Sequence, residues 1–459
     1  MELFPPAEAT IAGTLDALRS GRTTCRAVLE ACLARIDDRE HEVHAWAFLD
    51  REGARAQADR LDADRKAGRP LGPLAGIPIG VKDIINVAGL PTEYGVPGYE
   101  DLLCSTLSEP EADELRGCTI PEHDAPIVAE LKRRGAIILG KAVTTPYAWI
   151  DPPPTRNPWN LDHTPGGSSS GPAAAVACGM CLGALGSQTG GSITRPASFC
   201  GVAGFKPTYG SWRAEGVFPL AQSLDHPGPI ARTVADLALL ANIRRPGPFE
   251  KPLTIGRLRH WFDERTEPTM LDAMEHVTTA LRAAGHRVVR LSMPREFPEI
   301  AAHHFTILSA EAAVNHHRLL ERHPACYPPR IRKLVEEGKT VTHVDYLDST
   351  YFQRLVRVHG LFDSHLGEVD ALLTPAALGP APGLETTGDP AFNSPWSFLG
   401  LPTITHPIGL SPDGLPLGLQ LIGRAGLEGA ASLFGVALRT EAALRKAAGA
   451  TELPPLPGS

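Results

Sequence analysis

The sequence predicts an α/β protein, because stretches with helical spacing alternate with short apolar stretches that suit buried strands. Strands are predicted at 76–84 and 136–139, and the apolar run from Pro172 to Leu185 predicts a buried helix followed by a further strand. The chain has 459 residues, of which 43% are hydrophobic and 21% are charged, a composition typical of soluble globular proteins. These observations predict the class of the fold and leave the order of its strands open.

The N-terminal region predicts helices. Apolar side chains recur every three or four residues between Leu15 and Ile36, and Thr23-Thr24 offers an N-cap within this span. A charged helix is predicted over Arg51–Lys66, and a helix that leads into a strand is predicted over 127–139. Helices and strands therefore alternate through the first third of the chain.

Two clusters of glycine and serine, GGSSSG at 166–171 and GGS at 190–192, bracket the apolar run. Glycines let the backbone approach a ligand closely, and successive N–H groups can then converge on one point. A serine hydroxyl becomes a nucleophile only when a base removes its proton. One of the seventeen histidines could be that base in a Ser-His-Asp arrangement, although the chain has no G-x-S-x-G motif to support this interpretation.

A lysine is the second candidate base. Lys82 is the one cation in the apolar run GIPIGVKDI at 76–84. Burial of a lone lysine lowers the pKa of its amine, which leaves the amine free to accept a proton near neutral pH. The alternative is that Lys82 reaches solvent at the end of a strand, beside Asp83. The residues alone leave both interpretations open.

An ordered set of motifs resembles the amidase signature family of serine hydrolases. The motifs are GIPIGVKD at 76–83, GK at 140–141, NPWN at 157–160, TPGGSS at 164–169, TGGSI at 189–193, GFKPTYG at 204–210, SLDHPGPIARTVAD at 223–236, GLP at 400–402 and GLPLGLQLIG at 414–423. The resemblance covers nearly the whole chain and is weakest over 245–365, a divergent and mainly helical region. It implies a single domain over 1–459, built on a mixed, twisted central sheet of many strands with helices on both faces.

The resemblance also implies the catalytic roles. Lys82 corresponds to the general base, Ser168 to a bridging serine that follows a cis peptide bond, and Ser192 to the nucleophile. Ser168 then passes a proton between the lysine amine and the nucleophile. The N–H groups expected to form the oxyanion hole are those of Thr189, Gly190, Gly191 and Ser192.

Three further residues are expected to support these groups. Ser169 is expected to hydrogen-bond to the catalytic residues. Gln188 stands where many family members have an aspartate, so an amide rather than a charge is expected to hold the structure around the nucleophile. Arg195 lies three residues after Ser192, whereas the corresponding arginine often lies two residues after the nucleophile.

Four aromatic residues are candidates for the substrate pocket. Tyr147 and Trp149 precede three consecutive prolines, and Phe392 and Trp396 follow a loop rich in proline and glycine. Aromatic side chains of this kind suit an apolar pocket, but they equally suit an ordinary core.

The segment Pro97–His123 is longer than the family pattern and irregular in its spacing. We expect it to form a lid over the pocket of Ser192, with Tyr99, Leu102 and Leu103 as its apolar contacts. The alternative is a surface insertion without a function.

Charge and composition favour a cytoplasmic protein that binds neither nucleic acid nor membrane. The net charge is −8, no run of eighteen apolar residues occurs, and the first residues lack the features of a secretory leader. Eight cysteines, including Cys178 and Cys181 in an apolar segment, are interpreted as reduced, buried thiols. Neighbouring histidines at 303–304 and 316–317, and His323, are interpreted as structural, so no metal and no organic cofactor is expected.

The function that we expect is hydrolysis of a carbonyl C–N bond through an acyl-enzyme on Ser192. The preferred substrate is a neutral, apolar, aryl-containing small molecule with an amide, anilide or carbamate (urethane) bond, cleaved by a monomer or homodimer. The A subunit of a tRNA-dependent amidotransferase, which needs a B subunit together with a surface for tRNA, is the alternative. A catalytically silent binding protein is the second alternative.

Overall fold

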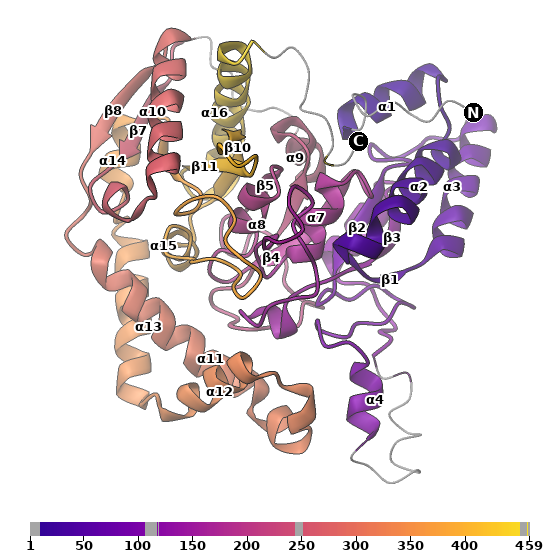
Figure 1. Ribbon diagram of the computed structural model, residues 1–459, viewed down its shortest axis with the longest axis horizontal. Coiled ribbons are helices and arrows are strands. Elements are labelled where there is room, and N and C mark those ends of the chain that lie inside the picture. Colours follow the sequence, from indigo (N-terminus) through magenta and orange to yellow (C-terminus); the bar gives the residue numbers. More distant parts are fainter. Residues whose placement is uncertain (1–9, 106–116, 118, 244–250, 450–456, 458–459) are drawn as a thin grey trace.

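Eleven strands form one sheet in the computed structural model of the chain, which describes residues 10–105, 117, 119–243, 251–449 and 457 (Figure 1). In chain order the strands are β1 (Trp46–Leu49), β2 (Pro78–Lys82), β3 (Ile137–Ala142), β4 (Gly183–Gln188), β5 (Ala203–Lys206), β6 (His226–Ala231), β7 (Thr254–Leu258), β8 (Arg287–Leu291), β9 (Ala371–Pro375), β10 (Thr403–Leu410) and β11 (Pro416–Ile422). Their order across the sheet is β1-β3-β2-β4-β6-β5-β10-β11-β9-β7-β8. Parallel and antiparallel neighbours both occur, so the sheet is mixed, as predicted.

The helices surround this sheet. They are α1 (Ile11–Ser20), α2 (Cys25–Val43), α3 (Arg51–Lys66), α4 (Tyr99–Cys104), α6 (Pro126–Arg133), α7 (Ser170–Ala177), α8 (Thr194–Phe199), α9 (Val234–Leu240), α10 (Pro268–Ala283), α11 (Ile300–Arg322), α12 (Pro329–Thr340), α13 (His343–Val358), α14 (Asp363–Glu368), α15 (Ser394–Leu399) and α16 (Gly426–Ala447). The predicted helix over Arg51–Lys66 is confirmed, and Thr24 caps α2 by accepting a hydrogen bond from the N–H of Ala27.

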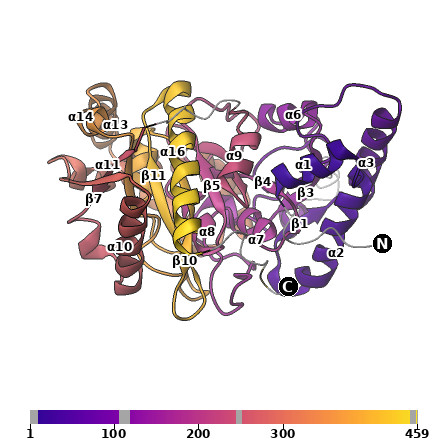
Figure 2. The same cartoon turned by 90° about the horizontal axis from the view of Figure 1, so that it is seen from above.

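Two crossover connections explain why helices lie on both faces of the sheet. β2, β3 and β4 are parallel, and β2 lies between the other two. The connection through α6 steps from β2 to β3, and the connection through α7 steps in the opposite direction, from β3 past β2 to β4. Since such crossovers are right-handed, α6 and α7 cover opposite faces. Figure 2 shows the two helices with β3 and β4 between them.

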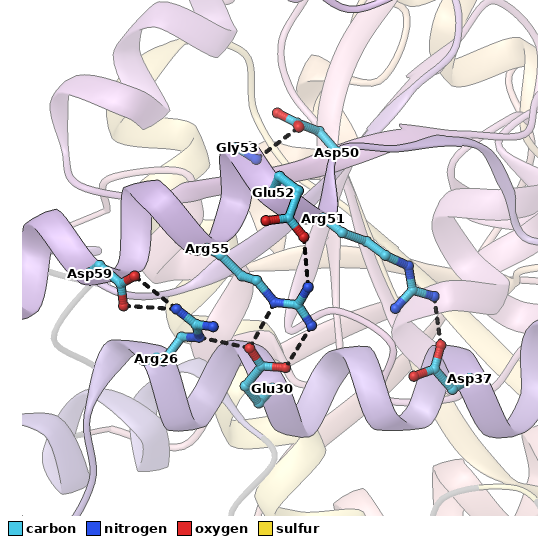
Figure 3. Close-up of polar contacts among 9 residues, drawn as sticks. All are labelled: Arg26, Glu30, Asp37, Asp50, Arg51, Glu52, Gly53, Arg55 and Asp59. Carbon is cyan, nitrogen blue, oxygen red and sulfur yellow. Dashed lines mark hydrogen bonds and ion pairs between the residues drawn. The ribbon is translucent and has the colours of Figure 1, made fainter.

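Ion pairs join α2 to α3 on the surface (Figure 3). Glu30 of α2 accepts hydrogen bonds from Arg26 Nε at 2.7 Å and from Arg55 Nε of α3 at 2.9 Å. A second pair joins Arg51 of α3 to Asp37 of α2 at 2.6 Å. The contact between these two helices is therefore charged at its surface, while Leu29 and Leu33 of α2 are buried beneath it.

The region 245–365 contains α10 to α13 and also supplies β7 and β8 to one edge of the sheet. α11 packs against both α12 and α13, and the three helices extend away from the sheet (Figure 1). α11 also packs against α15, which brings a divergent part of the sequence close to the ends of the central strands. Among the described residues, no helix combines the length and the apolar character that crossing a membrane requires.

Candidate active site

Three polar side chains meet where β2 and β4 end. Lys82 is the last residue of β2, and its Nζ lies 2.7 Å from Ser168 Oγ and 2.8 Å from Ser187 Oγ. β2 and β4 are parallel neighbours, with Val81 opposite Leu185, so their carboxyl ends lie side by side. Ser168 follows the cis peptide bond between Gly167 and Ser168, just before α7. The structure therefore brings together two of the three predicted catalytic side chains.

Lys82 is fully buried, and no carboxylate of the described residues lies within ion-pair distance of its amine. Burial lowers the pKa of Lys82 well below its usual range, and the negative charge of Asp225 opposes this shift to a smaller extent. The neighbouring serine hydroxyls carry no charge that would stabilise an ammonium ion. The amine is therefore suited to accept a proton from Ser168.

Ser192 lies in the turn between β4 and α8, with 8% of its surface exposed. The N–H of Ser169 donates to the carbonyl of Ser192 at 3.2 Å, and the Ser169 hydroxyl donates to the carbonyl of Ser187 at 3.2 Å. Ser169 thus connects the turn that carries Ser192 to the segment that carries Ser168. This position fits the supporting role that the sequence predicts for it.

Gln188 forms hydrogen bonds through both the oxygen and the nitrogen of its side-chain amide. Its Oε1 accepts hydrogen bonds from the N–H groups of Ile193 at 2.9 Å and Thr194 at 3.0 Å, and its Nε2 donates to Ser397 Oγ at 3.2 Å. An amide both accepts and donates, whereas a carboxylate only accepts. The contact with Ser397 explains physically why an amide suits this position.

The four N–H groups predicted for the oxyanion hole are free to bind a ligand. Those of Thr189, Gly190, Gly191 and Ser192 donate to no acceptor in the part of the chain that the structure describes. A side chain at position 191 would collide with Asn393 and Arg195, because a Cβ atom there would lie 2.5 Å from Asn393 Oδ1 and 3.0 Å from Arg195 Nη1. Any larger residue at this position would therefore force Asn393 or Arg195 to shift.

Arg195 supports the segment before Ser168. Its Nη2 donates to the carbonyl of Gly167 at 2.8 Å, and its Nε donates to the carbonyl of Thr387 at 2.6 Å. The side chain is 2% exposed, and burial lowers the pKa of Arg195 to about 10, against the opposing charge of Asp389. This arginine therefore stays charged near neutral pH and ties two loops together.

Sequence reasoning missed three residues at this site. Ser187, which contacts Lys82, precedes Gln188 without any motif of its own. Asp225 lies within the motif SLDHPG, which contributed to the family resemblance but was given no role in the site. Its carboxylate accepts a hydrogen bond from Thr189 Oγ1 at 2.5 Å, and burial raises the pKa of Asp225 to about 7. His304, interpreted as structural, places Nε2 3.1 Å from the carbonyl of Thr189. Only the fold brings these residues to the site.

A pocket of about 240 Å³ opens onto Ser192. Its lining includes Trp149, Arg195, His304 and Asp389, together with the turn from Thr189 to Ser192. The pocket therefore presents a carboxylate, a guanidinium and an imidazole beside its apolar walls. A small polar acyl group suits such a pocket.

Three of the four aromatic residues predicted for the pocket do not line it. Tyr147, Phe392 and Trp396 are each at most 1% exposed and pack in a cluster of aromatic side chains. Tyr147 stacks on Tyr327 at 4.4 Å between ring centroids, and Phe392 lies 4.9 Å from Phe262. The expectation that these three residues contact a substrate is therefore corrected, because their rings are enclosed by other rings.

The predicted lid over 97–123 falls partly outside the described residues, which omit 106–116 and 118. Its described helix, α4, buries Tyr99 and Leu103, and the ring of Tyr99 lies 5.1 Å from that of Tyr94. None of the described residues of the segment lines the pocket at Ser192. The lid function remains a prediction.

The structure also gives the surroundings of the histidines and cysteines that the sequence singled out. His303 contacts Ser349 Oγ at 3.0 Å, and His316 contacts the hydroxyl of Tyr327 at 3.0 Å. In the described ranges, no three His, Cys, Asp or Glu side chains are grouped so as to hold a metal ion. Cys178 and Cys181 are buried as free thiols, and burial raises the pKa of Cys178 to about 12.

Comparison with known proteins identifies relatives of this chain. The family model described as Amidase matches residues 27–431. The A subunit of the glutamyl-tRNA(Gln) amidotransferase of Synechococcus sp. (strain CC9605) is 32% identical, over 90% of this chain and 92% of the relative. The protein of the same name from Roseiflexus castenholzii is 34% identical, over 92% and 94%. The crystal structure of an amidase superposes with a TM-score of 0.83 at 31% identity, covering 94% of this chain and 99% of the amidase.

These relatives correct two expectations. The preferred function, cleavage of a neutral aryl amide or carbamate, is wrong, because the curated relatives are named as components of an amidotransferase, which favours the stated alternative. The expectation of a monomer or homodimer without a nucleic-acid partner is wrong for the same reason. A net charge of −8 describes the average charge of this chain and does not by itself exclude a nucleic-acid partner.

Proposed function

This chain belongs to the amidase family, and we propose that it is the amide-hydrolysing component of an amidotransferase that acts on glutamate attached to tRNA. The observation that carries the proposal is the match to the A subunit of such an enzyme over about nine-tenths of both chains. The described site supports the same chemistry, because it combines a buried amine, a serine hydroxyl bonded to that amine, and unoccupied N–H donors around Ser192.

The proposed reaction begins on a primary amide. Neutral Lys82 accepts the proton of Ser168 while Ser168 accepts the proton of Ser192, and Ser192 Oγ bonds to the carbonyl carbon. The negative charge that develops on the carbonyl oxygen is stabilised by the N–H groups of the turn from Thr189 to Ser192.

Collapse of this intermediate breaks the C–N bond. Ser168 returns a proton to the leaving nitrogen, which departs as ammonia and leaves the acyl group on Ser192. Water then attacks the ester by the reverse proton path and restores the three side chains. The ammonia is the nitrogen source for the transfer that the complete enzyme carries out on tRNA-bound glutamate.

The pocket supports a polar amide donor over an apolar aryl substrate. Asp389 and Arg195 lie in its lining, so an acyl group that carries charged or hydrogen-bonding groups finds partners there. The volume of about 240 Å³ accommodates an acyl group the size of an amino acid.

Complementation tests this proposal. The chain is expressed in bacteria whose own A subunit is repressed while its partner proteins remain, and the formation of glutaminyl-tRNA from glutamyl-tRNA is measured. We expect the chain to restore it and Ser192→Ala to fail. If the chain releases ammonia from L-glutamine, L-asparagine or acetamide yet never restores glutaminyl-tRNA, it is an amidase without the transfer function, and the proposal is wrong.

A further inference from the structure

A histidine from the divergent helix α11 contacts the turn that carries Ser192. His304 Nε2 lies 3.1 Å from the carbonyl oxygen of Thr189, and its side chain is 6% exposed. A carbonyl oxygen only accepts hydrogen bonds, so Nε2 carries the proton. Burial lowers the pKa of His304 to about 4, so the imidazole is neutral with one tautomer at ordinary assay pH.

The geometry of the peptide unit links this contact to the oxyanion hole. The carbonyl of Thr189 and the N–H of Gly190 belong to one planar trans peptide, in which they point in opposite directions. A donor that holds the carbonyl on one side therefore fixes the direction of the N–H on the other side.

The next peptide is held in the same way. Ser397 Oγ donates to the carbonyl of Gly190 at 2.9 Å, which fixes the N–H of Gly191. Both N–H groups lack an acceptor among the described residues, so they remain available to a ligand. A hydrogen bond to a carbonyl also polarises its amide and strengthens the N–H as a donor.

We propose that His304 is a positioning residue of the hydrolytic reaction, which aims the N–H of Gly190 at the oxyanion by holding the carbonyl of Thr189. His304 needs no contact with the reacting atoms for this role. The inference rests on the proposed function in one respect, namely that Ser192 is the nucleophile. It gives α11, where the resemblance is weakest, a part in catalysis.

A structural role for His304 predicts a different pattern. If the ring only fills space near Phe398, whose centroid lies 6.5 Å away, an apolar replacement would change the melting temperature and leave turnover intact. His316 is the matched control, because it is a buried histidine on the same helix that bonds to Tyr327 and Pro219 rather than to the turn.

The test compares His304→Leu, His304→Gln and His316→Gln. For His304→Leu we expect kcat for amide hydrolysis to fall about 10- to 100-fold with KM within about two-fold, because loss of an oxyanion donor itself costs about 10²- to 10³-fold. Affinity for a boronic acid, whose tetrahedral adduct on Ser192 resembles the oxyanion, should fall by the same factor. His304→Gln keeps an N–H donor at this point and should recover most of both losses, and His316→Gln should leave both unchanged.

Two outcomes separate this inference from the proposed function. If Ser192→Ala is inactive while His304→Leu retains full kcat and boronate affinity, the positioning role is wrong and the serine mechanism stands. If Ser192→Ala remains active, the proposed function fails first. Should His304→Leu fail to fold, Ser397→Ala tests the same principle at the next peptide, because it removes the donor to the carbonyl of Gly190. Unchanged kcat and boronate affinity in Ser397→Ala would then overturn the inference.

Discussion

Two buried lysines lie on neighbouring strands, and their partners differ. Lys141 of β3 forms an ion pair with Asp83 at 3.0 Å, which balances its charge inside the protein. Lys82 of β2 has hydroxyl groups as partners instead, at Ser168 and Ser187. Burial lowers the pKa of both amines, but at Lys141 the charge of Asp83 opposes this shift directly, whereas the hydroxyl partners of Lys82 carry no charge. Lys141 is therefore suited to a structural role, whereas Lys82 is suited to proton transfer.

The pH dependence of the reaction should report on Lys82. The base works only when neutral, so kcat/KM for an amide should rise with pH and level off, with one apparent pKa below the value of about 10.4 of a free lysine. The sign follows from burial, which lowers the pKa of this amine and so extends activity toward neutral pH. A steady-state profile from pH 5 to 10 measures it. A bell-shaped profile centred near pH 6.5 would point to a histidine base.

Substitutions of the reacting side chains should each lower activity, and their effects on kcat should not be additive. Ser192→Ala and Lys82→Ala should each lower kcat by about 10³-fold or more, and the double variant should be little worse than either, because the groups act as one unit. Ser170→Ala is the matched control, since this buried serine bonds to the carbonyl of Gly166 and not to Lys82. Hydrolysis rates and fluorophosphonate labelling measure the effect. More than a few per cent of activity in Ser192→Ala would exclude it as the nucleophile.

At the scale of elements, local sequence patterns predicted those helices, strands and caps that depend on neighbouring residues. The apolar run after the first glycine-serine cluster predicted a helix and a strand, and α7 and β4 confirm it. Thr24 was predictable as an N-cap because capping depends on a few adjacent residues. The contact of His304 with Thr189 was not predictable, because its partners are 115 positions apart in the sequence and only the packing of α11 joins them. The aromatic residues were misplaced for the same reason, since a pocket wall and a core have similar composition.

The contact between α2 and α3 should depend on one carboxylate. Glu30 bonds to Arg26 and Arg55, so Glu30→Gln should lower the free energy of unfolding by about 1 kcal/mol, and less in 1 M salt. The hydrogen bond from Arg55, with a smaller share from Arg26, lowers the pKa of Glu30, so this stabilisation is complete above the unfolded pKa of about 4.3 and is lost as the pH falls through the folded value. Urea titrations at pH 7 and below pH 4 measure it.

Glu52→Gln provides the comparison for this element. Glu52 also bonds to Arg55, at 2.9 Å, but its side chain is 86% exposed. Its loss should leave the urea midpoint unchanged, because water screens an exposed pair. Equal midpoints for the Glu30 and Glu52 variants would show that the network contributes nothing specific to this contact.

At the scale of the whole molecule, the sheet is assembled from two halves of the sequence. β1 to β6 form one side and β7 to β11 the other, and they meet where β5 pairs with β10. The class of the fold followed from alternating helix and strand patterns. The strand order did not, because pairing between strands some 200 residues apart leaves no local trace, and here it was the family resemblance that implied the sheet.

The site crosses this boundary between halves. Lys82, Ser168 and Ser192 come from the first half, while His304 and Ser397, which hold the turn around Ser192, come from the second. An enzyme whose nucleophile and supporting groups lie in different halves needs both to be assembled. This arrangement supports the prediction, so far untested, that residues 1–459 form a single domain.

Splitting the chain tests that prediction. Fragments 1–243 and 251–459, expressed separately, should each lack cooperative unfolding, because each leaves an edge strand unpaired and exposes the apolar faces with which α8 and α9 contact β10, β11 and α16. Expressed together, the fragments should associate and recover fluorophosphonate labelling of Ser192, since the same contacts can form without a covalent link. Calorimetry and labelling of each preparation measure this. If fragment 1–243 alone unfolds cooperatively and labels at Ser192 as fast as the intact chain, the first half is a domain by itself, and the second half serves another purpose.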